Sequence, residues 1–203
     1  YSAGKPLHVT VLGQRGSRKA VTWHKASIAG HVMARGLPVT DAQRTWLDLG
    51  NALTVPEAVA VADAILRRGY VKVLSVPDGI RGAVCLRCAR ELADPRSQSP
   101  KESILRAELH LAGLPKPEVN LDVYEHGDWV GRGDLVWCEY RLYVEYDGGH
   151  HIDPQQRHQD AQTRNRLGQL GWTVRVVTED MMKHVHEVVS MPTEDLVQAG
   201  WRA

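Results

Sequence analysis

Polar and apolar residues alternate along the second half of the chain in a way that predicts a mixed α/β domain. The alternation typical of half-buried strands covers about residues 118–125, 130–138, 141–147 and 172–178. Helices are expected around and between these strands, at about residues 99–112, 154–170 and 179–190. Because some strands follow one another directly and others are joined through a helix, this order predicts a mixed β-sheet flanked by helices.

The first half of the chain predicts a smaller α/β segment. Residues 7–12 and 20–24 alternate like short strands. A capping-box signature at residues 40–43 opens a short helix. Thr54, with Glu57 three residues later, opens a longer helix whose apolar residues repeat with the helical period.

A polar stretch with two prolines, residues 94–100, separates these halves and is the expected domain boundary. Asp63 and Arg67 lie four residues apart on the helix before it and are expected to form an exposed ion pair. The predicted division is therefore an N-terminal segment over residues 1–94, an α/β domain over 97–190 and a C-terminal tail over 191–203.

The composition is that of an ordinary globular protein. Of 203 residues, 43% are hydrophobic and 24% are charged, and the formal net charge is +1. These values exclude disordered and collagen-like classes, and any basic surface has to be local. The chain has no apolar run of roughly 18 residues, no signal peptide and no disulfide framework, so we expect a cytoplasmic protein that does not enter a membrane. Cys85 and Cys88 lack the further ligands of a zinc site, which favours free thiols.

Three carboxylates fall on the predicted hairpin of strands 130–138 and 141–147. A two-residue turn between these strands sets Asp134 directly opposite Glu145. Opposed Cβ atoms lie roughly 4.5–5.5 Å apart, and like charges there destabilise the pairing unless a cation lies between them. The alternation of side chains puts Asp147 on the same face as Glu145. The pattern predicts a site for Mg²⁺ or Mn²⁺, which prefer oxygen ligands.

Each of these acids also has a purely structural interpretation. Asp134 follows a glycine and is suited to capping a turn. Glu145 has Arg132 and Arg141 as possible ion-pair partners. Asp147 precedes a glycine, and the two form a common turn dipeptide.

Four segments between about residues 97 and 190 carry a resemblance to a known family; in chain order they are SPKESILRAELHLAGLPKPEVN, GRGDLVW, LYVEYDGGHH and RHQDAQTRNRLGQLGWTVRVVTED. This order resembles the domain-of-unknown-function family allied to the very-short-patch-repair endonuclease, in the PD-(D/E)XK nuclease superfamily. Residues 30–95 resemble the C-terminal part of the AbiEi-type antitoxin. The resemblance implies a restriction-endonuclease-like domain that acts on DNA. A winged-helix segment usually comes first in such proteins, and a chain that opens at Tyr1 is consistent with trimming.

Carried over position by position, the resemblance makes Glu102 the helix acid, Asp134 the metal-binding aspartate and Glu145 the second metal-binding acid. Asp147 then stands where a nuclease of this superfamily carries a lysine. An aspartate cannot supply that cation, so a metal would do more of the work of holding water and phosphate. His151 is the candidate acid/base or phosphate-polarising group, because histidine titrates near neutral pH.

Other assignments near the site remain open in the sequence. Glu102 lies in the first turn of a helix, where an acid favours the helix dipole, and Glu108 is the alternative helix acid. Arg164 either binds phosphate, with Asp160 orienting it, or forms an ion pair with Asp160 four residues before it. Arg157 is a further candidate for contact with nucleic acid.

The leading expectation is a metal-dependent DNA endonuclease or nickase that hydrolyses phosphodiester bonds with Mg²⁺ or Mn²⁺. The alternative is a nuclease fold that has lost its chemistry and acts as a DNA-binding or antitoxin-like regulator, because the lysine is missing. A third interpretation, a scaffold that binds no DNA, rests only on the near-neutral charge.

Overall fold

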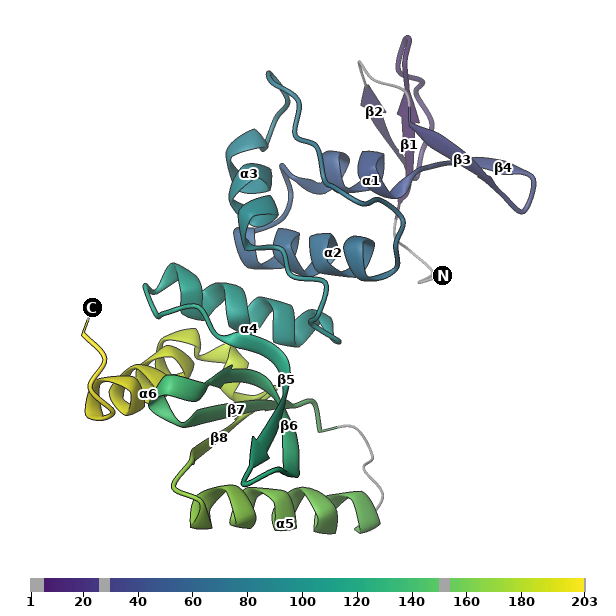
Figure 1. Ribbon diagram of the computed structural model, residues 1–203. Helices are drawn as coiled ribbons and strands as arrows, with labels where there is room; N and C mark the ends of the chain where they lie inside the picture. Colours follow the sequence, from purple (N-terminus) through teal and green to yellow (C-terminus); the bar gives the residue numbers. More distant parts are fainter. Residues whose placement is uncertain (1–5, 26–29, 150–153, 203) are drawn as a thin grey trace.

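The structure, a computed structural model, describes residues 6–25, 30–149 and 154–202 and has a mixed α/β architecture, as predicted (Figure 1). Its helices and strands are, in chain order, β1 (Leu7–Val11), β2 (Val21–Lys25), β3 (His31–Ala34), β4 (Leu37–Thr40), α1 (Ala42–Leu49), α2 (Val55–Arg67), α3 (Ala83–Leu92), α4 (Pro100–Leu111), β5 (Glu118–Glu125), β6 (Asp128–Trp137), β7 (Leu142–Asp147), α5 (Pro154–Gln169), β8 (Thr173–Thr178) and α6 (Val185–Gln198). The β3–β4 hairpin and α3 were not predicted.

The C-terminal half is built on a four-stranded sheet in the order β5-β6-β7-β8. The first three strands are antiparallel neighbours, and β8 lies parallel to β7 because α5 carries the chain across. Helices α4 and α6 cover one face and α5 covers the other (Figure 1). The apolar residues of the strands alternate between these two cores, and this confirms the predicted mixed sheet flanked by helices.

The last helix differs from the prediction. A single 3₁₀ turn occupies Met181–Lys183, and α6 then runs from Val185 to Gln198. Pro192 lies inside this helix, where a proline removes one backbone hydrogen bond. Val188 and Leu196 are nevertheless buried against the sheet, and their packing holds the helix through that point. Most of the predicted tail is therefore part of the domain.

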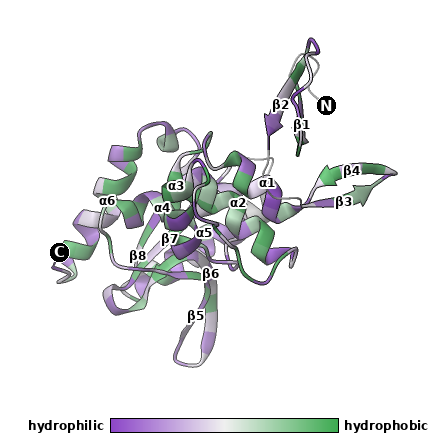
Figure 2. Ribbon diagram, turned by 90° about the horizontal axis from the view of Figure 1, so that it is seen from above, coloured by the Kyte–Doolittle hydropathy of each residue, from purple (hydrophilic) through white to green (hydrophobic). Residues whose placement is uncertain are grey.

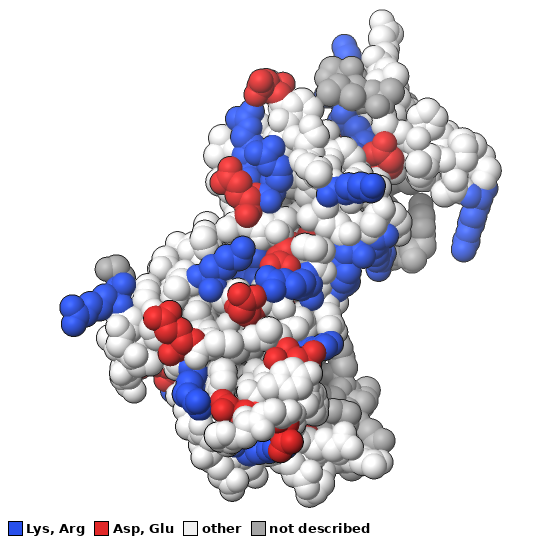
Figure 3. Space-filling view, viewed as in Figure 1, with Lys and Arg blue, Asp and Glu red and all other residues white. Residues whose placement is uncertain are grey.

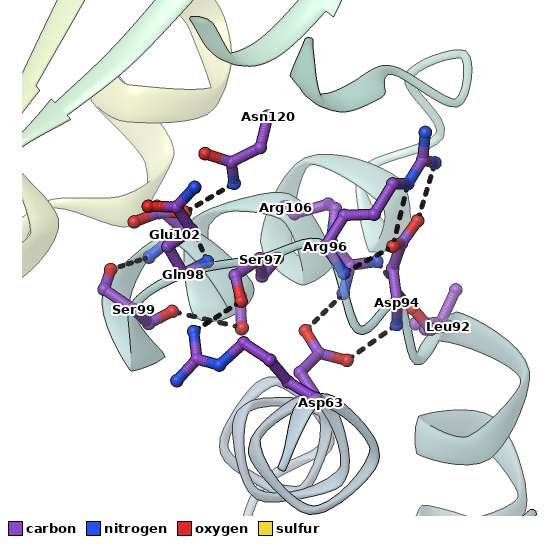
Figure 4. A network of polar contacts seen from close by, with 12 residues as sticks. Asp63, Leu92, Asp94, Arg96, Ser97, Gln98, Ser99, Glu102, Arg106 and Asn120 are labelled. Atoms are coloured by element: carbon purple, nitrogen blue, oxygen red, sulfur yellow. Dashed lines mark hydrogen bonds and ion pairs between the residues drawn. The ribbon is translucent and has the colours of Figure 1, made fainter. Parts of the chain in front are cut away.

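The predicted boundary at residues 94–100 is not a solvated linker. Asp94 and Ser97 are buried, and the backbone N–H of Asp94 donates to Asp63 Oδ1 at 2.7 Å (Figure 4). Arg67 donates to the carbonyl oxygen of Ser97 at 2.6 Å. The expected exposed pair of Asp63 with Arg67 is wrong, because Asp63 is only 1% exposed and binds Arg106 of α4.

Helix α4 belongs to both halves of the molecule. Its Ala107 packs into a core made by α1, α2 and α3, whereas Leu105 and Leu109 pack against the sheet. The predicted second domain therefore shares its first helix with the N-terminal helices.

Surface features are consistent with the mixed composition. Acidic and basic side chains are interspersed on the face shown in Figure 3. The β3–β4 and β5–β6 hairpins project from the body of the molecule (Figure 2). Among the residues that the structure describes, no helix is long and apolar enough to cross a bilayer.

Candidate active site

The β6–β7 hairpin has the predicted register. Its turn is a short 3₁₀ helix over Cys138–Tyr140, closed by a 3.3 Å hydrogen bond from Arg141 N to Cys138 O. The paired residues are Leu135 with Val144, Val136 with Tyr143 and Trp137 with Leu142. The same register places Asp134 opposite Glu145, as predicted. The ladder stops immediately before this pair, so the two strands separate there.

A pocket of about 340 Å³ opens where the strands separate. Charged side chains from β6, β7 and α5 line it: Arg132, Asp134, Glu145, Asp147, Asp160 and Arg164. Four carboxylates and two guanidinium groups thus share one opening. The sequence analysis identified all of these residues except Arg132, which it considered only as a partner of Glu145.

Glu145 is held by two donors. The hydroxyl of Tyr143 donates to Glu145 Oε1 at 3.1 Å, and Arg164 Nε donates to Oε2 at 2.9 Å. Tyr143 lies close over Gly133, where a Cβ would come within 2.7 Å of the tyrosine ring. Glycine at this position therefore makes room for the ring. Burial, and then the charge of Glu145, raises the pKa of Tyr143, which keeps its hydroxyl a donor.

The alternative ion pairs expected for Glu145 do not form. Arg132 binds Asp122 on the neighbouring strand, and Arg141 lies 3.3 Å from Glu125. Arg164 forms the ion pair with Glu145 instead. The Nε of Arg164 therefore donates to Glu145, and not to Asp160 as one of the two sequence interpretations expected. This choice depends on where α5 packs, which no local pattern revealed.

Asp134 is an acid of the site whose pKa is strongly shifted by its surroundings. Its Oδ2 accepts a 2.7 Å hydrogen bond from the backbone N–H of Tyr146, which lowers its pKa. Burial outweighs that bond and, together with the charges of Glu102 and Glu145, raises the pKa of Asp134 to about 7. The protonated form of this carboxyl is therefore populated at neutral pH. A divalent cation beside it would favour the ionised form.

Glu102 reaches the same region from the first turn of α4. The helix is capped by Ser99, whose Oγ accepts from Glu102 N at 3.2 Å. Glu102 is 7% exposed, and its carboxylate accepts at Oε2 from Gln98 N (2.8 Å) and Asn120 Nδ2 (2.9 Å) (Figure 4). The register of β5 with β6 puts Asn120 opposite Asp134, and its left-handed φ of 49° interrupts the strand pairing.

The acids Asp147 and Glu108 differ in whether they line the pocket. Asp147 lines the pocket, and its Oδ1 also accepts from Gly149 N at 2.9 Å, which is the turn contact that its sequence context suggests. Neither Glu102 nor the alternative helix acid Glu108 lines the pocket.

Some predicted residues fall outside what the structure describes. His151 lies outside the described residues, as does His150, and the side chain of Arg157 is not described either. Asn120 and Tyr143 were missed by the sequence analysis. Tyr143 had a signal, since it lies two positions before Glu145 on the same strand face, whereas Asn120 had none.

The donor chemistry fits a hard divalent cation, because every acid in the pocket offers oxygen. Among the residues that the structure describes, no three acidic, histidine or cysteine side chains converge on a position for one ion. The two oxygens of Glu145 both have donors, so a cation would have to share this carboxylate with Arg164 or displace it.

Comparison with known proteins gives two curated relatives, both from Mycobacterium tuberculosis, in strains CDC 1551 / Oshkosh and ATCC 25618 / H37Rv. Each is 32% identical in an alignment of 147 residues that covers 68% of this chain and 54% of the relative. The chain thus spans about half the length of the curated relatives it matches. Both relatives are named as uncharacterized proteins. No protein-family model and no solved structure matches the chain.

Proposed function

We propose that the protein is a metal-dependent DNA endonuclease or nickase with a restriction-endonuclease-like domain of the very-short-patch-repair type. The observation that carries the proposal is the pair of opposed carboxylates, Asp134 and Glu145, in a pocket flanked by two arginines. Clustered acids beside guanidinium groups suit phosphodiester hydrolysis, which needs an activated water and relief of negative charge on phosphate.

The candidate ligands for Mg²⁺ or Mn²⁺ are Asp134, Glu145 and Asp147, with Glu102 close enough for its charge to act on Asp134. Because these acids do not converge on one ion position among the described residues, a bound ion would have to draw them together. When bound, the ion would lower the pKa of a water molecule and withdraw charge from phosphate. The chain's own residues have separate tasks. Tyr143 orients Glu145 through its hydroxyl. Arg164 and Arg132 lie on the walls of the pocket, where their guanidinium groups are suited to binding phosphate oxygens.

Cleavage of supercoiled plasmid by the full chain tests the proposal, because nicked and linear products separate on a gel. We expect cleavage that requires Mg²⁺ or Mn²⁺, and that falls at least about 100-fold in Asp134→Asn. Asp78→Asn is the matched control, since Asp78 has a fully exposed side chain bound to Arg87 and lies outside the pocket. Metal-dependent cleavage that survives in Asp134→Asn would contradict the assignment.

A second candidate is a DNA-binding regulator that has lost catalysis. Two observations favour it: Asp147 stands where the family resemblance implies a lysine, and Arg164 already binds Glu145. This candidate predicts DNA binding that weakens steeply with salt and no cleavage with any divalent metal. Measuring binding and cleavage on the same DNA separates the two functions.

A further inference from the structure

Two exposed aromatic side chains lie together at the end of the β5–β6 hairpin. Tyr124 and Trp129 are partners across the two strands and are 61% and 53% exposed. The turn between them uses His126 and Gly127, both with left-handed φ angles (54° and 90°), which suits a tight hairpin. This hairpin projects from the body of the molecule (Figure 2). Large aromatic side chains are usually buried, so a paired exposure at a projecting tip suggests a binding surface.

The tryptophan is fixed in place and connected to the candidate pocket. Its Nε1 donates to Asp122 Oδ1 at 2.9 Å, and Arg166 of α5 donates to its carbonyl oxygen at 3.3 Å. Asp122 also binds Arg132, whose Nε lies 3.0 Å from Oδ1, and Arg132 lines the pocket. The aromatic ring and the pocket arginine therefore share one anchoring carboxylate. A ligand that extends from the pocket along the hairpin meets the two rings next.

We propose that Tyr124 and Trp129 form a stacking platform for an unpaired nucleobase of DNA whose adjoining phosphate binds at Arg132. This inference rests on the proposed function and names the substrate feature that the site selects. A pocket with cations binds phosphate, and an aromatic face a short way along the chain binds the base of the same strand. Every base has a π-face, so the contact tolerates any sequence. The projecting tip favours a base that is already outside a duplex, because unstacking a paired base costs free energy.

Binding of the full chain to a single-stranded oligonucleotide carrying one fluorescent base analogue tests the platform, in buffer without divalent metal. Stacking on an aromatic ring quenches the analogue. We expect quenching by the wild type, and its loss in the double variant Tyr124→Ala with Trp129→Ala. Affinity in this variant should fall about 10- to 100-fold.

Two matched controls keep the test specific. Trp129→Phe removes the indole N–H bond to Asp122 but keeps an aromatic ring, so it should retain quenching and most of the affinity. Val84→Ala removes another exposed apolar side chain, 75% exposed on α3, and should bind like the wild type. Far-ultraviolet circular dichroism of each variant checks the fold.

The outcomes separate this inference from the proposed function. Unchanged affinity and quenching in the double variant overturn the platform, even if the wild type cuts DNA. Equal losses in Trp129→Phe and in the double variant also overturn it, because the hydrogen bond to Asp122 would then be the cause. Quenching without any metal-dependent cleavage supports the platform and rejects the endonuclease. A wild type that binds no oligonucleotide overturns the platform.

Discussion

Two acids of the molecule lose solvent contact on folding but have opposite surroundings. They are Asp63 in the N-terminal helices and Asp134 in the sheet. Burial raises the pKa of both. Asp63 binds Arg106 at 2.6 Å and also accepts from the backbone N–H of Asp94. Asp134 accepts one backbone hydrogen bond, and the charges that shift its pKa are those of the acids Glu102 and Glu145. The first acid is compensated by a cation, whereas the second lies among like charges.

This difference distinguishes a structural acid from a candidate functional one. A buried ion pair with additional hydrogen bonds fixes how elements pack, and Asp63 joins α2 to α4 in this way. A carboxyl that lines a pocket and has its pKa raised by burial and by neighbouring acids is typical of a functional site that binds a cation or a proton. Four predictions test the contrast.

The largest expected effect is on stability at Asp63. Asp63→Ala leaves the guanidinium of Arg106, which is only 7% exposed, without its carboxylate partner. We expect the free energy of unfolding to fall by about 3–5 kcal/mol, measured by urea denaturation. Asp78→Ala, at a fully exposed carboxylate, should change it by less than about 0.5 kcal/mol. A small change in the free energy of unfolding of Asp63→Ala would contradict the interpretation of Asp63 as a structural acid.

The next effect is on metal binding at Asp134. The amide of Asp134→Asn keeps the shape of the carboxyl but cannot carry its charge. Binding of Mn²⁺, followed by isothermal titration calorimetry, should be lost or at least about 100-fold weaker, since a charged ligand is removed. Asp63→Asn should still bind Mn²⁺ under conditions in which it is folded. If both variants lose binding equally, the comparison fails.

A third effect is on the pH dependence of stability. The pKa of Asp134 is about 7 in the folded protein and about 3.9 in an unfolded chain, so the folded state binds the proton more tightly. Its contribution is fully present below about pH 4 and is lost as the pH rises through about 7. Because this carboxyl is half-buried, we expect a loss on the order of 1–2 kcal/mol.

Urea denaturation across this pH range measures that loss. Asp134→Asn should flatten the decline and be more stable than the wild type at neutral pH. The same slope in both proteins would show that Asp134 does not titrate in this range.

The smallest effect concerns Tyr143, which donates to Glu145. Tyr143→Phe keeps the ring over Gly133 and removes only the hydroxyl. We expect metal-dependent cleavage to fall about fivefold, corresponding to about 1 kcal/mol for one hydrogen bond, and the free energy of unfolding to fall by no more than about the same amount. Steady-state cleavage rates with varied Mn²⁺ measure it. A full loss of activity would indicate a direct role for the hydroxyl instead.

The sequence by itself determined the strands of the four-stranded sheet, most helices and the register that sets Asp134 against Glu145. Side-chain alternation and turn length are local properties, so a few consecutive residues specify them. The same local logic identified the cap at Thr54, whose side-chain oxygen accepts from a backbone N–H three residues later.

Only the tertiary structure decided which charged groups meet. Arg164 reaches Glu145, and Arg106 reaches Asp63, from helices 19 and 43 residues away in the chain. The extent of α6 and the burial of the predicted boundary were decided in the same way, by packing against the sheet and α2. The physical reason is that an ion pair depends on distances of a few ångströms between elements, and those distances are set by how whole helices and strands pack.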